Sequence, residues 1–286
     1  MAEECVPDTG DPRPIGVFDS GLGGLTTVRE LFRTLPAESV VYFGDTARVP
    51  YGNKSRATVT RFSLEIASFL VRQDVKCLVV ACNTSSCYAL EPLTRRLEIP
   101  VVGVIEPAAR AAVAASPGGR IAVIGTAATV GSGAYPEAIA RLRPGARVVS
   151  RACPLFVPLI EEGWLDHAVT RRVAEEYLAE LRDGRPESLI LACTHYPLIA
   201  SLLADVLGPA VTLVDSGAEA ARATAALLRE RGQLSTGPAR HGFFVSDERL
   251  NFTGIARSFL GGPPPEIQVV DQTDLPWYER SGGAVA

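Results

Sequence analysis

The chain has 286 residues, of which 47% are hydrophobic and 21% are charged, proportions typical of a soluble globular protein rather than a disordered or membrane-embedded one. Its formal net charge of −4 argues against nonspecific binding to nucleic acid or to a membrane surface. The N-terminus lacks the basic start and apolar run of a secretory signal. We therefore expect a cytoplasmic protein whose six cysteines are reduced thiols.

Apolar, β-branched runs alternate with segments of helical periodicity along the chain. Strands are expected at Ile15–Phe18, Val40–Phe43, Cys77–Ala81, Val101–Val104, Ile121–Ile124, Arg147–Ser150, Leu189–Ala192, Val211–Val214 and Gln268–Val270. Helices are expected at Thr26–Leu35, Lys54–Gln73, Glu106–Ala115, Glu137–Leu142, His167–Arg182 and Gly217–Arg231. This alternation predicts an α/β fold with parallel sheets, whose ligands bind beyond the carboxyl ends of the strands.

Two segments of the sequence occur twice in similar form. IGVFDSGLGGL at residue 15 resembles IAVIGTAATV at residue 121, and CLVVACNTSSC at residue 77 resembles SLILACTHYPL at residue 188, with nearly equal separations. We therefore expect two similar parallel-sheet α/β domains related by pseudo-twofold symmetry, with the active site between them. The expected boundaries are a flexible lead at 1–14, a first domain at 15–99 plus about 209–262, a second domain at 100–208 and a tail at 263–286.

Cys82 and Cys193 hold matching positions in this duplication. Each follows an apolar strand and precedes a polar residue suited to begin a helix, where N–H groups and the helix dipole lower the pKa of a thiol. A single free cysteine is usually a small core residue, but a pair in matched contexts favours a functional interpretation. The spacing of the cysteines lacks the C-x2-C pairs of structural zinc sites, so we expect no metal. The remaining cysteines are treated as bystanders: Cys5, Cys77, Cys87 and Cys153.

Two polar loops follow the first two expected strands. In the first, glycines allow close backbone approach to an anion, Asp19 suits an ammonium group and Ser20 suits a carboxylate. In the second, Pro50 fixes the backbone, Tyr51 offers a hydroxyl and Gly52 leaves room for a ligand carboxylate. Taken alone, the first loop also fits an ordinary helix cap and the second an ordinary turn. Neither has the spacing of a nucleotide-binding motif.

Six segments between residues 16 and 199 resemble the glutamate racemases, in the same order. They are GVFDSGLGGLT, GDTARVPYGNKS, ACNTSS, GVIEPA, FVPLIEEG and LACTHYPLI. The resemblance extends from about Ile15 to Leu260 and implies two similar α/β domains with the active site between them. It also implies interconversion of L- and D-glutamate without pyridoxal phosphate or a metal, with D-glutamate destined for peptidoglycan.

The resemblance further implies roles for individual residues. The cysteine matching Cys82 removes the Cα proton from D-glutamate, and the one matching Cys193 removes it from L-glutamate. Groups matching Asp19, Glu161 and His195 assist the thiols. The family's substrate contacts match Asp19, Ser20, Pro50, Tyr51, Gly52, Asn83, Thr84, Thr194 and His195.

Two bases on opposite faces of one carbon suit racemisation, because a single base that returns its own proton mostly regenerates the starting enantiomer. The same architecture would serve a racemase for aspartate or another amino acid. Aspartate racemases carry Glu rather than His after the second Cys-Thr, which favours glutamate here. A noncatalytic amino-acid-binding protein and, with less support because no C-x-x-C exists, a thiol oxidoreductase are further alternatives. A homodimer is compatible with the sequence.

Overall fold

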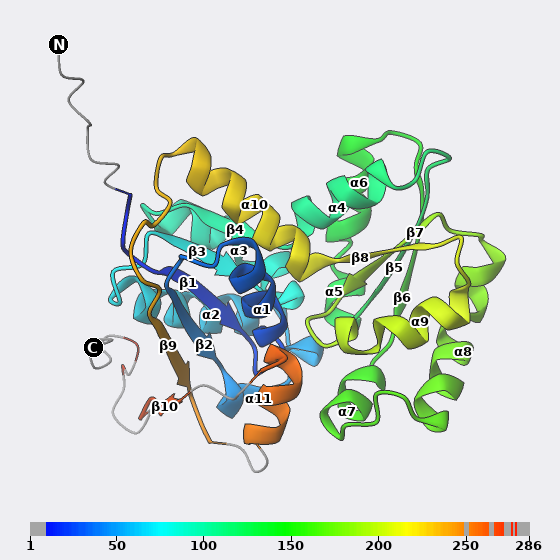
Figure 1. The fold of residues 1–286 in the computed structure, drawn as a ribbon. Coiled ribbons are helices and arrows are strands. Elements are labelled where there is room, and N and C mark those ends of the chain that lie inside the picture. Colours follow the sequence, from blue (N-terminus) through cyan, green and yellow to red (C-terminus); the bar gives the residue numbers. More distant parts are fainter. Residues whose placement is uncertain (1–9, 249–251, 263–265, 272–275, 277, 279–286) are drawn as a thin grey trace.

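The computed structural model of the protein describes residues 10–248, 252–262, 266–271, 276 and 278. Two parallel β-sheets form two lobes, and helices pack against both (Figure 1). The strand order of the first sheet is β10-β9-β2-β1-β3-β4. Its strands are β1 (Ile15–Asp19), β2 (Val40–Gly44), β3 (Cys77–Val80), β4 (Val101–Gly103), β9 (His241–Val245) and β10 (Gln268–Val269).

The second sheet repeats part of this order. Its strands follow the order β6-β5-β7-β8, which is equivalent to β2-β1-β3-β4 in the first sheet. This shared order agrees with the duplication inferred from the sequence, because the similar segments fall on β1 and β5 and on β3 and β7. Cys82 and Cys193 therefore follow equivalent strands. The strands of the second sheet are β5 (Arg120–Gly125), β6 (Arg147–Ala152), β7 (Ser188–Ala192) and β8 (Thr212–Asp215).

The chain passes between the lobes at points that differ from the expected boundaries. β4 pairs with β3 in the first sheet, although we placed residues from 100 onward in the second domain. β8 pairs with β7 in the second sheet, although we expected the return near residue 209. Both are short edge strands with few fully buried side chains, so their sequences do not specify a sheet. Each lobe thus contains a complete four-stranded unit before the chain crosses.

Helices of the first lobe include all those expected there and two more. They are α1 (Leu25–Thr34), α2 (Arg56–Val71), α3 (Asn83–Arg96), α10 (Ser216–Glu230) and α11 (Phe252–Leu260). The sequence interpretation did not predict α3 or α11, nor strand β9. The helix α10 begins at the second crossing and packs against both α1 and α4, so it joins the two lobes (Figure 1).

Helices of the second lobe are shorter on average. They are α4 (Ile105–Ala114), α5 (Ala127–Gly131), α6 (Ala134–Leu142), α7 (Phe156–Glu161), α8 (Ala168–Asp183) and α9 (Ala200–Leu207). Of these, α5, α7 and α9 were not predicted. Short 3₁₀ turns occupy Thr46–Arg48, Tyr51–Asn53 and Tyr196–Ile199. None of the helices in the described part of the chain is long and apolar enough to cross a membrane.

Alternation of side chains along β1 divides the core of the first lobe. Val17 packs in the cluster that contains the inner residues of α1 and α10. Phe18 packs on the opposite face, with Phe69 and Leu70 of α2. Each fully buried side chain of this size stabilises the fold by about 1.5–3 kcal/mol, and the period of two along the strand fixes which helix covers which face.

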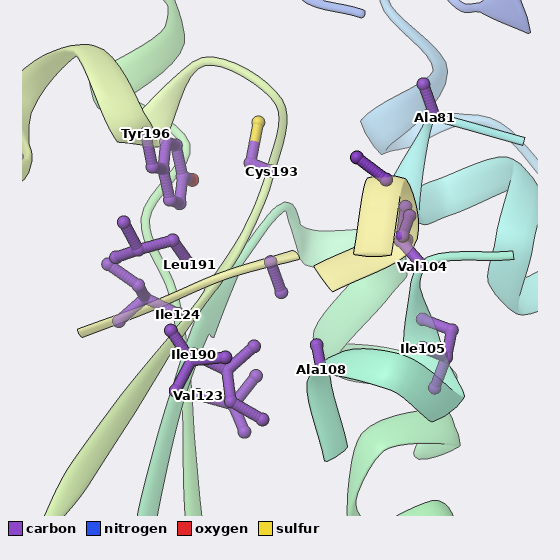
Figure 2. Packing of buried hydrophobic residues seen from close by; sticks show 14 of the residues in the cluster. Ala81, Val104, Ile105, Ala108, Val123, Ile124, Ile190, Leu191, Cys193 and Tyr196 are labelled. Carbon is purple, nitrogen blue, oxygen red and sulfur yellow. The ribbon is translucent and has the colours of Figure 1, made fainter. Parts of the chain in front are cut away.

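The cluster that contains Val17 continues into the second lobe. Figure 2 shows Ile190 of β7 beside Val123 and Leu191 beside Ile124 of β5, with the Cys193 sulfur pointing away from them at the end of the strand. Ala81 lies across from this thiol, in the other lobe. The carboxyl ends of β3 and β7 therefore mark the edge of the core where the two lobes meet.

Part of the expected N-terminal lead is attached to the first sheet. Residues 1–9 lie outside the described residues, but Pro14 accepts a hydrogen bond from the main-chain N–H of Lys76. The Lys76 side chain is buried; its Nζ lies 2.6 Å from Glu38 Oε2 and donates to the carbonyl oxygens of Asp11 (2.8 Å) and Gln233 (2.7 Å). The buried Lys76–Glu38 ion pair and these hydrogen bonds thus connect the segment before β1, the segment before β2 and the segment after α10.

Candidate active site

A cavity of about 450 Å³ lies where the carboxyl ends of the two sheets meet. It is lined by residues from both lobes, including Cys82 and Cys193. All but one of the site residues predicted from the sequence lie on its wall, and the exception is Asp19, which is buried behind it. The predicted residues on the wall are Ser20, Pro50, Tyr51, Gly52, Cys82, Asn83, Thr84, Glu161, Cys193, Thr194 and His195.

Cys82 is the N-cap residue of α3. Its Sγ accepts a hydrogen bond from the main-chain N–H of Ser85 at 3.4 Å, as expected of a thiol at a helix start. Burial nevertheless raises the pKa of the Cys82 thiol, and the nearby Asp19 carboxylate raises it further. The expectation of a lowered pKa is wrong for the free protein, because desolvation of the thiolate outweighs the helix N–H groups.

Cys193 has a different immediate environment. It is followed by a 3₁₀ turn, and the helix α9 begins only at Ala200. Its Sγ lies 3.9 Å from Nδ1 of His195, and His195 Nε2 lies 3.1 Å from Oε1 of Glu161. Burial raises the pKa of the Cys193 thiol well above its usual value, which favours the protonated thiol.

The His195–Glu161 pair offers Cys193 a route for its proton. When Nε2 carries the imidazole proton and donates it to Glu161, the lone pair of Nδ1 faces the Cys193 sulfur. The imidazole could then accept the thiol proton, and the carboxylate would stabilise the resulting imidazolium. The ring also rests edge-on against Phe259 of α11, with ring centroids 4.9 Å apart.

Asp19 ends β1 with one carboxyl oxygen unused. Oδ2 accepts a hydrogen bond from the main-chain N–H of Gly21 at 3.0 Å, whereas Oδ1 is buried without a hydrogen-bond partner among the described residues. Burial raises the pKa of this carboxyl, and the nearby His195 partly opposes the shift. A buried carboxyl group with an unused oxygen beside Cys82 is suited to exchange a proton or to bind a cation.

The glycine-rich loop after Asp19 touches the Cys193 loop across the lobes. A Cβ atom added at Gly23 would lie 2.2 Å from Thr194 Oγ1 and 2.6 Å from His195 Nδ1, so only glycine allows this approach. The Thr26 hydroxyl donates to the carbonyl oxygen of Thr194 at 2.9 Å. The predicted loops of the two lobes therefore form one continuous wall.

Tyr51 lines the cavity, but its hydroxyl is already engaged. It donates a short hydrogen bond to Asp45, which is fully buried at the end of β2. Asp45 also accepts hydrogen bonds from Arg48 and Ser246. The proton of this hydroxyl is thus used within the loop, and Tyr51 lines the cavity, where its contact with substrate remains a prediction.

Thr126 is a cavity residue that the sequence interpretation missed. It is the N-cap residue of α5 and lines the cavity opposite Gly52, whose added Cβ would lie 2.8 Å from the Thr126 Cβ. Its hydroxyl forms hydrogen bonds with those of Thr84 (3.1 Å) and Thr129 (3.0 Å). The duplication offered a signal, because Thr126 follows β5 as Ser20 follows β1.

Comparison with known proteins agrees with this geometry. Residues 15–224 match the family described as Asp/Glu/Hydantoin racemase. The chain belongs to this racemase family. A glutamate racemase from Geobacter metallireducens is 54% identical over 261 residues, which cover 90% of this chain and 96% of that protein.

Solved structures of other members of the racemase family have the same fold. A glutamate racemase isoform from Bacillus anthracis is 39% identical, with a TM-score of 0.88 over 91% of this chain and 98% of that one. A glutamate racemase from Francisella tularensis, solved in complex with D-glutamate, is 40% identical, with a TM-score of 0.84 and the same coverage. These relatives favour an isomerase over the binding protein and the thiol oxidoreductase that the sequence left open.

The three other cysteines in the described part of this racemase-family chain do not line the cavity. Burial raises the pKa of each of these thiols to about 12, which makes the reactive thiolate scarcer at neutral pH than in an exposed cysteine. These three are Cys77, Cys87 and Cys153, and Cys5 lies outside the described residues.

Proposed function

We propose that the protein interconverts L- and D-glutamate by proton transfer at Cα, with Cys82 and Cys193 as the two bases. The observation that carries the proposal is that both thiols follow equivalent strands of the two lobes and line one cavity. The relatives named as glutamate racemases, and the D-glutamate in one of them, support glutamate as the substrate.

In the D-to-L direction, the Cys82 thiolate takes the Cα proton and its sulfur becomes a thiol. The electron pair left on the substrate is stabilised as a carbanion until the Cys193 thiol gives its own proton to the opposite face. Cys193 is then the thiolate, and the L-to-D direction reverses each transfer. Every proton taken by one sulfur is matched by a proton given by the other.

The surrounding groups have two tasks in this mechanism. Hydroxyl groups and main-chain N–H groups at the loop ends, such as those of Thr84 and Thr194, would bind the substrate carboxylates and stabilise the carbanion. Asp19 beside Cys82, and His195 with Glu161 beside Cys193, would set which thiol is deprotonated before each turnover. Asp19 would therefore assist Cys82 when D-glutamate reacts, and His195 with Glu161 would assist Cys193 when L-glutamate reacts.

Racemisation in heavy water tests the proposal. We expect wild-type protein to place deuterium at Cα of the product, measured by proton NMR together with circular dichroism. The variants Cys82→Ser and Cys193→Ser should each lose at least about a hundredfold in turnover. Any residual exchange should be confined to the enantiomer whose Cα proton faces the remaining thiol.

Cys87→Ala is the matched control, because Cys87 lies on α3 close to Cys82 in sequence but off the cavity wall. It should racemise glutamate at the wild-type rate. Racemisation without Cα deuterium would overturn the proton-transfer mechanism, as would either serine variant at full rate. Aspartate tested in parallel would reveal a broader substrate range if it turned over as fast as glutamate.

The family resemblance supports a wider role for this reaction. We propose that the protein works in the cytoplasm without a cofactor and supplies D-glutamate for peptidoglycan synthesis. Expression in a bacterium that requires D-glutamate should restore growth, whereas Cys82→Ser should not. Light scattering would decide whether the protein is a homodimer.

A further inference from the structure

Asn83 follows Cys82 directly and begins α3, yet its side chain is bound by groups that belong to the second lobe and the crossing. We propose that Ser216 and Tyr135 are positioning residues: through Asn83 they fix the position of Cys82 relative to the strand end that carries Cys193. This inference rests on the proposed two-thiol reaction and names residues that neither the sequence motifs nor the cavity wall identified.

Ser216 stands at the point where the chain returns to the first lobe. Its hydroxyl donates to the carbonyl oxygen of Leu191 in β7 at 2.9 Å, two residues before Cys193. The Ser216 Oγ also accepts a hydrogen bond from Asn83 Nδ2 at 3.1 Å. One buried hydroxyl therefore connects the strand that precedes Cys193 with the helix that follows Cys82.

The position of Ser216 is itself fixed. The preceding residue, Asp215, accepts hydrogen bonds from the main-chain N–H groups of Gly217 (2.8 Å) and Ala218 (3.2 Å), which caps α10. Asp215 also pairs with Leu191 in the β7–β8 register. The hydroxyl is thus presented from a capped helix start and not from a mobile loop.

Tyr135 completes the connection from the second lobe. It lies on α6, its ring is fully buried, and its hydroxyl donates to Asn83 Oδ1 at 2.6 Å. Burial raises the pKa of this phenol well above its usual value, so the hydroxyl remains a donor throughout the neutral and mildly alkaline range. One end of the Asn83 side-chain amide is consequently held by the second lobe, through Tyr135, and the other by Ser216 at the crossing between the lobes.

This arrangement changes the role expected for the Asn83 side chain. Its carbonyl oxygen and one N–H are used in the connection, so the amide serves chiefly to join the lobes, while the main chain at the start of α3 remains for the substrate. Proton transfer between carbon and sulfur depends steeply on geometry, and a misplacement of about 1 Å can cost a hundredfold in rate. Loosening the connection should therefore act on turnover more than on binding.

Tyr135→Phe removes one hydroxyl without changing the ring, and Ser216→Ala removes the other. We expect each to lower kcat about tenfold for both enantiomers and to leave KM within about twofold. The double variant should lose clearly less than the product of the two single losses, because both act on one network. Tyr177→Phe is the control: the Tyr177 hydroxyl accepts a hydrogen bond from the main-chain N–H of Leu155, so its loss should leave kcat at the wild-type value.

A second measurement does not depend on turnover. The alkylation rate of Cys82 by iodoacetamide, followed by mass spectrometry, should change at least about threefold in both variants, whereas that of Cys87 on the same helix should not. A purely structural role would instead lower the unfolding temperature with kcat and Cys82 alkylation unchanged. That result in folded Tyr135→Phe and Ser216→Ala would overturn the inference, whereas a wild-type protein without racemase activity would overturn the proposed function.

Discussion

Replacing Gly23 with alanine perturbs the contact between the two predicted loops without touching either thiol. The added Cβ would lie 2.2 Å from Thr194 Oγ1 and 2.6 Å from His195 Nδ1, whereas an ordinary contact begins at 3.4 Å. The Thr194 and His195 side chains beside Cys193 must therefore shift by about 1 Å, and a misplacement of this size can lower kcat about a hundredfold. Crowding of this kind also lowers the free energy of unfolding by about 1–3 kcal/mol.

The assay is glutamate racemisation followed by circular dichroism, with thermal unfolding measured on the same sample. Gly237→Ala is the matched control, because a Cβ added there meets nothing within 4 Å, and it should leave kcat unchanged. If Gly23→Ala keeps more than half of the wild-type kcat, the contact between the loops does not position His195, and the reasoning fails.

Three further predictions concern ionisation and buried polar groups. In the folded protein the buried thiols of Cys77, Cys87 and Cys153 have a pKa near 12, whereas in the unfolded chain they lose their protons near the usual pKa of 9.0. The free energy of unfolding should therefore fall between pH 9 and 12, by about 1.4 kcal/mol per pH unit for each thiol. Urea unfolding that is independent of pH in this range would contradict this. Tyr51→Phe should change KM for glutamate less than about threefold and cost about 1 kcal/mol of stability, because the hydroxyl bonds to Asp45; a large rise in KM would show that it binds substrate. Lys76→Met should cost about 3–5 kcal/mol in chemical denaturation, because it leaves Glu38 buried without its partner, and adding Glu38→Leu should recover part of this loss; full stability of the single variant would refute the argument.

The sequence predicted the fold because its strong signals are local. All expected strands and helices are present, since period-two and helical patterns depend on side chains a few residues apart. The elements it missed include the strand His241–Val245, the helix Asn83–Arg96 and several short helices. The helix carries polar residues and Pro92 within it, and the five-residue strand is defined by its pairing with β2 and β10.

The sequence predicted which residues form the site, but not their pKa shifts or their hydrogen-bond partners. The duplication brought Cys82 and Cys193 to equivalent strand ends, so their presence in one cavity followed from the sequence. The raised pKa of both thiols did not follow, because burial depends on how the lobes close over the cavity. The partners of Tyr51 and Asn83 were likewise invisible, since Asp45 and Ser216 reach them only through tertiary contacts.

The unlike surroundings of the two thiols lead to a final prediction. L- and D-glutamate have equal free energies in water, so the equilibrium constant is unity and kcat/KM must be equal in the two directions for any variant. Glu161→Gln weakens the support of His195 beside Cys193, and we expect it to lower kcat/KM about tenfold to a hundredfold by the same factor for both enantiomers. The asymmetry can appear only in kcat and KM taken separately, measured by circular dichroism from each enantiomer. Wild-type kcat/KM in folded Glu161→Gln would show that the Glu161–His195 pair does not assist Cys193.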